Sequence, residues 1–328
     1  MTERLQGLRT WLGEGVGLSA FELEPIAGDA SFRRYFRVRM ADGATAVAMD
    51  APPQKESSRP FVEMARLLEG LGVHVPAIRA QDLDQGYLLL EDLGGRHYLD
   101  ALDETTVERL YGDALGALVT VQALGPREGL PAYDRTLLWQ EMNLFRDWLL
   151  DRHLGIGLSD EETAMLERLF GELVENALEQ PRVCVLRDFH SRNLMVTPRH
   201  NPGVLDFQDA VCGPVTYDLV SLLKDCYIAW PRARVEAWVA GYFDLAVQSG
   251  VLPEEHEKRF LRWFDLMGAQ RHLKAAGIFA RLNVRDSKPG YLPDIPRTLG
   301  YLVALGERYP ELEAAAAFCR DRVLPRLA

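Results

Sequence analysis

The sequence predicts an α+β fold, with a small β-rich N-terminal part and a larger, mainly helical C-terminal part. Apolar and polar residues alternate over residues 32–49, which is typical of half-buried strands. From about Glu104 onward, apolar residues recur with helical spacing. Short apolar runs within residues 183–207 interrupt that spacing and predict short strands joined by loops. We therefore divide the chain into residues 1–94 and residues 95–328.

In the N-terminal part, turn signals separate the expected elements. Asp42-Gly43 is a hairpin turn, and Gln81–Gly86 is a second turn. Arg34 interrupts the apolar face of its strand, and Pro60 lies in the first turn of a helix that Ser57 and Ser58 are expected to cap. The expected elements are a helix over residues 3–12, strands over 32–40 and 45–49, the helix after Ser58, and strands over 76–81 and 87–91.

The C-terminal part is expected to consist mostly of helices. One begins near Glu104 and buries Leu110, Ala114 and Leu118 on one face. The others are expected over residues 138–150, 161–178, 217–227, 234–249, 254–283, 295–309 and 312–323.

Composition bounds the class of protein. The 328 residues are 48% hydrophobic and 26% charged, which is ordinary for a globular protein, and the net charge of −11 argues against nucleic acid or an anionic membrane as a partner. No stretch approaches the ~20 apolar residues of a membrane span, and the N-terminus lacks a signal-peptide core. The four cysteines show no C-x-x-C pairing and are expected to be buried thiols. We expect a cytoplasmic monomer.

Residues 184–209 carry the chemistry. Asp188 is followed by Asn193 (193 − 188 = 5), then by the strand-like Leu194–Val196, a turn, and Asp206 (206 − 188 = 18). Phosphoryl transfer needs one carboxylate near the attacking hydroxyl, and an amide and a second carboxylate for Mg²⁺. Protein kinases arrange the same polar residues as H-R-D-x-x-x-x-N and D-F-G. We predict Asp188 to be the catalytic base or to orient the hydroxyl, and Asn193 and Asp206 to bind Mg²⁺; the alternatives are turn and cap roles.

These motifs resemble those of the aminoglycoside phosphotransferase and choline kinase-like family, small-molecule kinases with a two-lobed, protein-kinase-like fold. The resemblance extends to Asp209, Gly213-Pro214 and Tyr217-Asp218-Leu219. It implies that ATP is the phosphate donor and that Asp218 hydrogen-bonds the backbone of the catalytic loop. His190 is expected to have a structural role, and Asp209 is either an outer metal ligand or a turn residue.

Within that family, residues 28–38, 48–53 and 211–231 most resemble a bacterial branch of cell-wall recycling enzymes. The resemblance implies phosphorylation of the anomeric hydroxyl of N-acetylmuramate and N-acetylglucosamine during peptidoglycan recycling. A kinase for choline, an aminoglycoside, another sugar or a similar hydroxylated metabolite is the alternative. A nucleotide-binding pseudokinase is a third reading, which the complete Asp188, Asn193 and Asp206 set disfavours.

The nucleotide side departs from the kinase pattern. Gly28, Ala30 and Ser31 belong to a candidate phosphate-covering loop, and the backbone of Glu91 to Leu93 is expected to meet the adenine. Kinases of this fold place a lysine on the third strand, paired to a helix glutamate. Val47–Asp50 has no lysine, although Glu63 stands near the place of the partner acid. We expect Arg33 or Arg34, more than Lys55, to compensate; the alternative is that the metal and the backbone suffice.

The acceptor side has a basic segment. Residues 265–297 carry six cations and three acids, a net charge of +3 (6 − 3), in an otherwise acidic chain. An aminoglycoside kinase would need an acidic pocket and a choline kinase an aromatic cage, so the segment favours an anionic or neutral acceptor. We predict Arg271 and Arg281 to meet the carboxylate of N-acetylmuramate, and Tyr227 to stack on the sugar; a solvated helix face and core packing are the alternatives.

Overall fold

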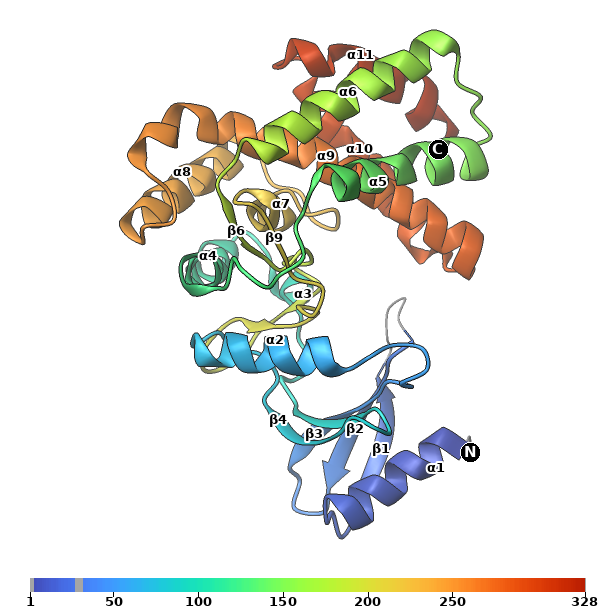
Figure 1. The fold of residues 1–328 in the computed structure, drawn as a ribbon, viewed down its shortest axis with the longest axis vertical. Helices are drawn as coiled ribbons and strands as arrows, with labels where there is room; N and C mark the ends of the chain where they lie inside the picture. The colour runs from blue at the N-terminus through green and yellow to red at the C-terminus, as the bar shows by residue number, and fades with distance from the viewer. Residues whose placement is uncertain (1–2, 27–31, 328) are drawn as a thin grey trace. The chain divides into compact units, whose positions relative to one another are not determined.

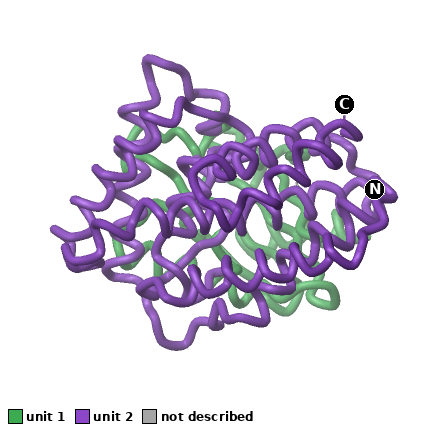
Figure 2. Tube along the Cα trace, turned by 90° about the horizontal axis from the view of Figure 1, so that it is seen from above, with its two compact units in different colours: residues 1–96, 195–209 green, residues 97–194, 210–328 purple. Residues whose placement is uncertain are grey.

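In a computed structural model, described here for residues 3–26 and 32–327, the chain folds into two compact units. Unit 1 comprises residues 1–96 and 195–209, and unit 2 comprises residues 97–194 and 210–328 (Figure 2). Residues 195–209 thus join the N-terminal residues, although they follow Asp188 in the chain. The expected α+β class is confirmed, because unit 1 is built on a sheet and unit 2 is mostly helical.

Unit 1 contains a five-stranded antiparallel sheet with the strand order β1-β2-β3-β5-β4 (Figure 1). The strands are β1 (Phe21–Ile26), β2 (Arg34–Met40), β3 (Thr45–Asp50), β4 (Ile78–Asp82) and β5 (Tyr87–Glu91). The helices are α1 (Glu3–Thr10), extended by a π-helical turn, η1 (Trp11–Gly15), and α2 (Arg59–Gly70).

Helices cover both faces of this sheet. Leu8 and Leu12 pack in one buried cluster with Phe36, Val38 and Leu89, so α1 and η1 cover that face. Residues of opposite parity point to the other face, where Met49, Leu88 and Leu90 are also buried. Figure 1 shows α2 on that side, and its apolar face is buried as expected.

The capping of α2 differs from the expectation. Ser58 lies at the N-cap position but has helical backbone angles, and its side chain makes no capping hydrogen bond. Ser57 instead accepts a hydrogen bond from the N–H of Arg59 at 3.3 Å. Glu63 on α2 is exposed.

Unit 2 is organised around one long helix, α9 (Glu257–Asp286), which contacts five of the other helices given below, namely α5, α6, α7, α8 and α10. Gly277 is needed there, because a Cβ atom at this position would lie 2.2 Å from the backbone carbon of Leu144. The other helices are α3 (Tyr98–Ala101), α4 (Val107–Leu124), α5 (Arg135–Leu144), α6 (Asp160–Leu178), α7 (Tyr217–Leu223), α8 (Arg232–Gln248), α10 (Ile295–Leu305) and α11 (Pro310–Phe318).

Short elements complete the fold. π-Helical segments η2 (Phe145–His153) and η5 (Cys319–Val323) continue α5 and α11, and short 3₁₀ turns are η3 (Glu254–His256), η4 (Pro289–Asp294) and η6 (Leu324–Arg326). Strands β6 (Arg182–Val185) and β9 (Val211–Pro214) form an antiparallel pair, and β7 (Leu194–Met195) pairs with β8 (Gly203–Val204). All four cysteines are buried free thiols, as expected. Among the described residues, no helix has the length and apolar character needed to cross a membrane.

Candidate active site

Asp188 lies in the loop that joins β6 to β7 in unit 2. The loop is closed by its own hydrogen bonds: the N–H of His190 donates to the backbone oxygen of Asp188 at 3.0 Å, and the N–H of Asn193 donates to that of His190 at 2.9 Å. The side-chain nitrogen of Asn193 also donates to the backbone oxygen of Asp188, at 3.0 Å. The backbone of Arg187 has a positive φ of 75°, which a residue with a side chain adopts only when its surroundings hold it there.

Two buried carboxylates hold this loop from outside. Asp218 on α7 accepts hydrogen bonds from the N–H groups of Leu186 at 2.6 Å and Arg187 at 2.9 Å, which confirms the expected backbone contact. Asp225, just after α7, accepts from the N–H of Ser191 at 2.9 Å. Its other oxygen accepts from the N–H of Tyr227 at 2.9 Å, so the chain leaves helical geometry here and the helix expected to reach residue 227 ends at Leu223.

The carboxylate of Asp188 is ionised, and its oxygens have no ion-pair or hydrogen-bond partner among the described residues. Burial raises the pKa of this carboxyl, but the positive charges of Lys274 and Arg271 outweigh burial and hold the pKa below its ordinary value. Among the described residues, no cation lies within ion-pair distance of this side chain and none donates a hydrogen bond to it. A carboxylate in this state can accept a proton or orient a hydroxyl.

A buried ionic cluster lies behind Asp188. Glu141 on α5 is ion-paired with Arg187 and with Lys274, whose Nζ lies 3.0 Å from its Oε1. Lys274 also donates to the hydroxyl of Tyr217 at 2.7 Å. The second carboxylate oxygen of Glu141 accepts from the hydroxyl of Tyr133. Two of the cations that act on Asp188, Lys274 and Arg187, are therefore held by a neighbouring acid.

Arg271, on α9, is buried and lacks a carboxylate partner. Only 6% of it is exposed, its Nη1 lies 3.9 Å from the sulfur of Cys226, and its Nε has no hydrogen-bond partner in the part of the chain that is described. Burial lowers the pKa of this guanidinium, but Cys226 and other nearby acidic groups reverse the effect, so it stays charged. Arg281 is only half-buried, and burial together with Arg285 lowers its pKa.

Two further cations of the basic segment pair with nearby acids. Arg285 pairs with Asp286, and Arg297 pairs with Asp294. Of the segment's cations, Arg271 and Lys274 are the two that act on Asp188.

An aromatic group borders the loop in unit 2. The half-buried ring of Tyr227 meets the edge of His190 with centroids 5.4 Å apart, and the guanidinium of Arg192 lies 4.5 Å from its centroid. Phe279 and Tyr291 continue the group. Burial lowers the pKa of His190, which keeps the imidazole neutral, and its Nδ1 has no hydrogen-bond partner among described residues. One cation therefore already lies against the ring predicted to stack on a sugar.

Asp206 lies in unit 1, next to the buried Phe207. Asp206 is exposed, has a positive φ of 59°, and accepts a hydrogen bond from the side chain of Gln208 at 2.7 Å. Phe207 packs on Phe61 of α2 with ring centroids 5.0 Å apart. Asp209 is exposed and makes no hydrogen bond or ion pair with the described residues.

The arginines expected to replace the lysine both have carboxylate partners. Arg33 is buried, pairs with Glu56, and lies over the ring of Phe61 at 5.8 Å. Arg34 pairs with Asp50 on β3, which also pairs with Arg4. Lys55 lies over the exposed ring of Phe32 at 5.6 Å.

Arg33 and Asp206 act on a common neighbour. Burial raises the pKa of Tyr35, and the charges of both Arg33 and Asp206 also influence it. Arg33 therefore lies at the same end of unit 1 as the predicted metal ligand.

Only some of the other residues predicted to contact the nucleotide lie in the described part of the chain. Glu91 ends β5, accepts a hydrogen bond from the N–H of Ala77 at 3.3 Å, and lies 3.5 Å from the ring nitrogen of His74. Leu93 is buried. Gly28, Ala30 and Ser31 lie outside the described residues.

Sequence reasoning missed Asp225, Glu141 and Glu56. Asp225 and Glu141 lie far from Asp188 in the chain, and no local pattern marks them. Glu56 precedes α2, whereas the kinase pattern directs attention to a residue within the helix.

The fold and the loop chemistry define a phosphotransferase. The profile of the phosphotransferase enzyme family matches residues 22–264, and the chain belongs to this family. Membership in a kinase family implies that ATP is used.

The chain is also similar to individual proteins that are named as kinases. The chain is 50% identical over 320 residues to an N-acetylmuramate/N-acetylglucosamine kinase of Pseudomonas aeruginosa, with 94% of each chain covered. It is 47% identical over 320 residues to a kinase of the same name from Pseudomonas putida, again with 94% of each covered. The structure is similar to a choline kinase from Streptococcus pneumoniae, with a TM-score of 0.64 and 12% identity over 92% of this chain and 100% of the other, which shows a shared fold.

Proposed function

We propose that the protein transfers the γ-phosphate of ATP to the anomeric hydroxyl of N-acetylmuramate and N-acetylglucosamine, giving sugar 1-phosphates for peptidoglycan recycling. The names of the two Pseudomonas relatives support the choice of sugars. The observation that carries the chemistry is Asp188, an ionised carboxylate without an ion-pair partner among the described residues.

In the proposed reaction, the hydroxyl oxygen bonds to the γ-phosphorus while the bond from that phosphorus to the β-phosphate oxygen breaks. ADP leaves, and the hydroxyl proton passes to Asp188. The positive charges of Lys274 and Arg271 keep that carboxylate ionised beforehand. Positioning of the hydroxyl and electrostatic stabilisation are the main contributions that a protein makes to such a transfer.

Asn193 and Asp206 are the proposed oxygen donors to Mg²⁺, which offsets the charge on the transferring phosphates when bound. The donor set fits, because Mg²⁺ usually takes one or two protein ligands and completes its shell with water and phosphate. Asn193 uses its side-chain nitrogen for the backbone of Asp188, so its amide oxygen is the atom suited to a cation. Asp206 brings an exposed carboxylate.

The metal assignment is tested with Asp206→Ala and Asn193→Ala, by calorimetric titration of nucleotide at several Mg²⁺ concentrations as well as by turnover. We expect both to require more Mg²⁺, Asp206→Ala the more strongly because a charge is lost. Asp209→Asn tests the third acid, for which we expect a smaller effect. Unchanged Mg²⁺ dependence in both alanine variants would mean that the metal binds elsewhere.

The substrate assignment is tested by ADP release against N-acetylmuramate, N-acetylglucosamine, choline and an aminoglycoside. The matched control is the 1-O-methyl glycoside of N-acetylglucosamine, which lacks the anomeric hydroxyl and should not react. Phosphorus NMR of the product should show phosphate on C1. Turnover of the methyl glycoside, or of choline or the aminoglycoside alone, would overturn the proposal.

A further inference from the structure

We propose that Glu141 is a positioning residue that keeps two neighbouring cations from pairing with the catalytic carboxylate of Asp188. The inference rests on the proposed function only in taking Asp188 as the group that receives the hydroxyl proton. Nothing in the comparisons assigns a role to Glu141.

Glu141 is built to hold cations. It is buried, and burial raises the pKa of its carboxyl, but Lys274 and Arg187 lower that pKa more strongly, so the group is ionised. The Oε1 atom of Glu141 forms ion pairs with both Arg187 and Lys274. The other accepts from the hydroxyl of Tyr133 and, at 3.4 Å, from Gln270. A carboxylate with both oxygens engaged in this way has little freedom to move.

Both cations otherwise have reason to pair with Asp188. Arg187 is its neighbour in the chain, and Lys274 shares one oxygen of Glu141 with Arg187. A buried cation without a partner is costly, so it moves to a carboxylate within reach. An ion pair at Asp188 would occupy the oxygens that must accept the hydroxyl proton. Glu141 therefore holds both cations in ion pairs of their own and leaves the oxygens of Asp188 open to the hydroxyl.

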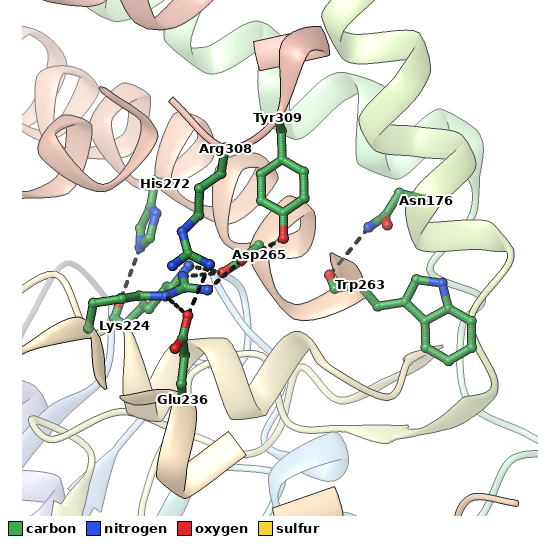
Figure 3. A network of polar contacts seen from close by, with 9 residues as sticks. Asn176, Lys224, Glu236, Trp263, Asp265, His272, Arg308 and Tyr309 are labelled. Atoms are coloured by element: carbon green, nitrogen blue, oxygen red, sulfur yellow. Dashed lines mark hydrogen bonds and ion pairs between the residues drawn. The ribbon is translucent and has the colours of Figure 1, made fainter. Parts of the chain in front are cut away.

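The structure supplies a matched control on α9, the helix that carries Lys274. Asp265 is also a buried carboxylate held by a lysine and an arginine, since Lys224 donates to it at 2.7 Å and Arg232 at 2.6 and 2.7 Å. Figure 3 shows this network, in which Tyr309 donates to Asp265 and Arg308 pairs with Glu236. Asp265 is not among the strongest charges acting on Asp188. Its loss should destabilise unit 2 without quenching the base.

The test compares Glu141→Gln, Lys274→Met, the double variant and Asp265→Asn, with kcat, both KM values and thermal unfolding measured for each. We expect Glu141→Gln to lower kcat by about tenfold or more while the acceptor KM changes by less than about threefold, because the loss concerns the base and not binding. Removing Lys274 as well, in the double variant, should restore part of that kcat, because only Arg187 is then left to pair with Asp188. Asp265→Asn should lower the unfolding temperature but retain the wild-type kcat per folded molecule.

A merely structural role for Glu141 predicts a different pattern. The two single losses in kcat would then multiply in the double variant, and that result would overturn the proposal, as would an unchanged kcat in Glu141→Gln. If Glu141→Gln does not fold, Glu141→Asp and the double variant decide: near wild-type kcat in Glu141→Asp with a loss below about tenfold in the double variant supports the proposal, and a larger loss in the double variant contradicts it. The assays use whichever acceptor the wild type phosphorylates, so a wrong sugar assignment is detected separately.

Discussion

The side chain of Asn193 donates a hydrogen bond to the backbone oxygen of Asp188 at 3.0 Å. The residue proposed to bind the metal is thereby tied to the one proposed to receive the proton. Both depend on a single loop, which Asp218 holds at one end and Asp225 at the other. Changes that loosen either carboxylate contact should therefore affect turnover without touching the substrate.

The first prediction concerns Asp218 and pH. Burial raises the pKa of Asp218 to about 7, with the hydrogen bonds from Leu186 and Arg187 opposing that shift. An unfolded aspartate titrates near ~3.9, so the folded protein binds an extra proton between these values. The stability due to this proton is fully present below about pH 4 and is lost as the pH rises through about 7.

The measurement is urea unfolding of the wild type and Asp218→Asn across that range. A difference of about three between the two pKa values corresponds to about 4 kcal/mol, which is the upper limit of the expected change in their relative stability. The variant itself should show no such dependence at this position. A wild-type-minus-variant difference that stays constant with pH would contradict the account.

The second prediction concerns Asp225. Asp225→Ala removes the acceptor for the N–H of Ser191, leaving a buried donor unsatisfied. We expect kcat to fall by about tenfold or more with little change in the KM for ATP. Asp225→Asn keeps one acceptor oxygen, so its kcat should lie between those of the wild type and Asp225→Ala. Wild-type kcat in Asp225→Ala would show that Asp218 alone fixes the loop.

The third prediction concerns the missing lysine. Because Arg33 pairs with Glu56 beside Phe61, we expect this arginine to offset the charge of the nucleotide phosphates. Arg33→Ala should raise the KM for ATP by about tenfold, which is ~1.4 kcal/mol, and Glu56→Gln should change it in the same direction. The comparison variants are Arg34→Ala and Lys55→Ala. Arg34 pairs with Asp50 in the wild type. A large defect in Lys55→Ala alone would reverse this order.

The fourth prediction concerns the acceptor. Arg271 is buried and charged without a carboxylate partner among the described residues, so it suits the carboxylate that N-acetylmuramate has and N-acetylglucosamine lacks. Arg271→Gln should lower kcat/KM for N-acetylmuramate about 5- to 150-fold more than for N-acetylglucosamine, as expected for ~1–3 kcal/mol. The half-buried Arg281 should matter less. Equal losses for both sugars would leave Arg271 a purely electrostatic role.

Sequence spacing could predict the loop because its defining contacts are local. Asp188 and Asn193 are five positions apart and bond directly, and the apolar runs beside them form β6 and β7. The family resemblance predicted the contact between Asp218 and the loop, which joins residues 32 positions apart in the chain. Alternation and helical spacing also predicted most strands and helices of both units.

Contacts between distant segments of the chain could not be predicted from the sequence. Glu141 pairs with Arg187 across 46 positions, and nothing in the sequence around Glu141 marks it as polar core rather than surface. Asp225 looked like part of a helix that in fact ends at Leu223. The net charge of the basic segment did not specify the partners of its cations: Arg285 and Arg297 pair with nearby acids, whereas Arg271 is buried.

The central claim is that Asp188 is the base of a phosphotransferase, and Asp188→Asn tests it most directly. The amide keeps the shape of the side chain but cannot take the hydroxyl proton. The account predicts that turnover with N-acetylmuramate falls by at least about 10²-fold while sugar and nucleotide still bind, as measured by calorimetry. Turnover close to that of the wild type would contradict it.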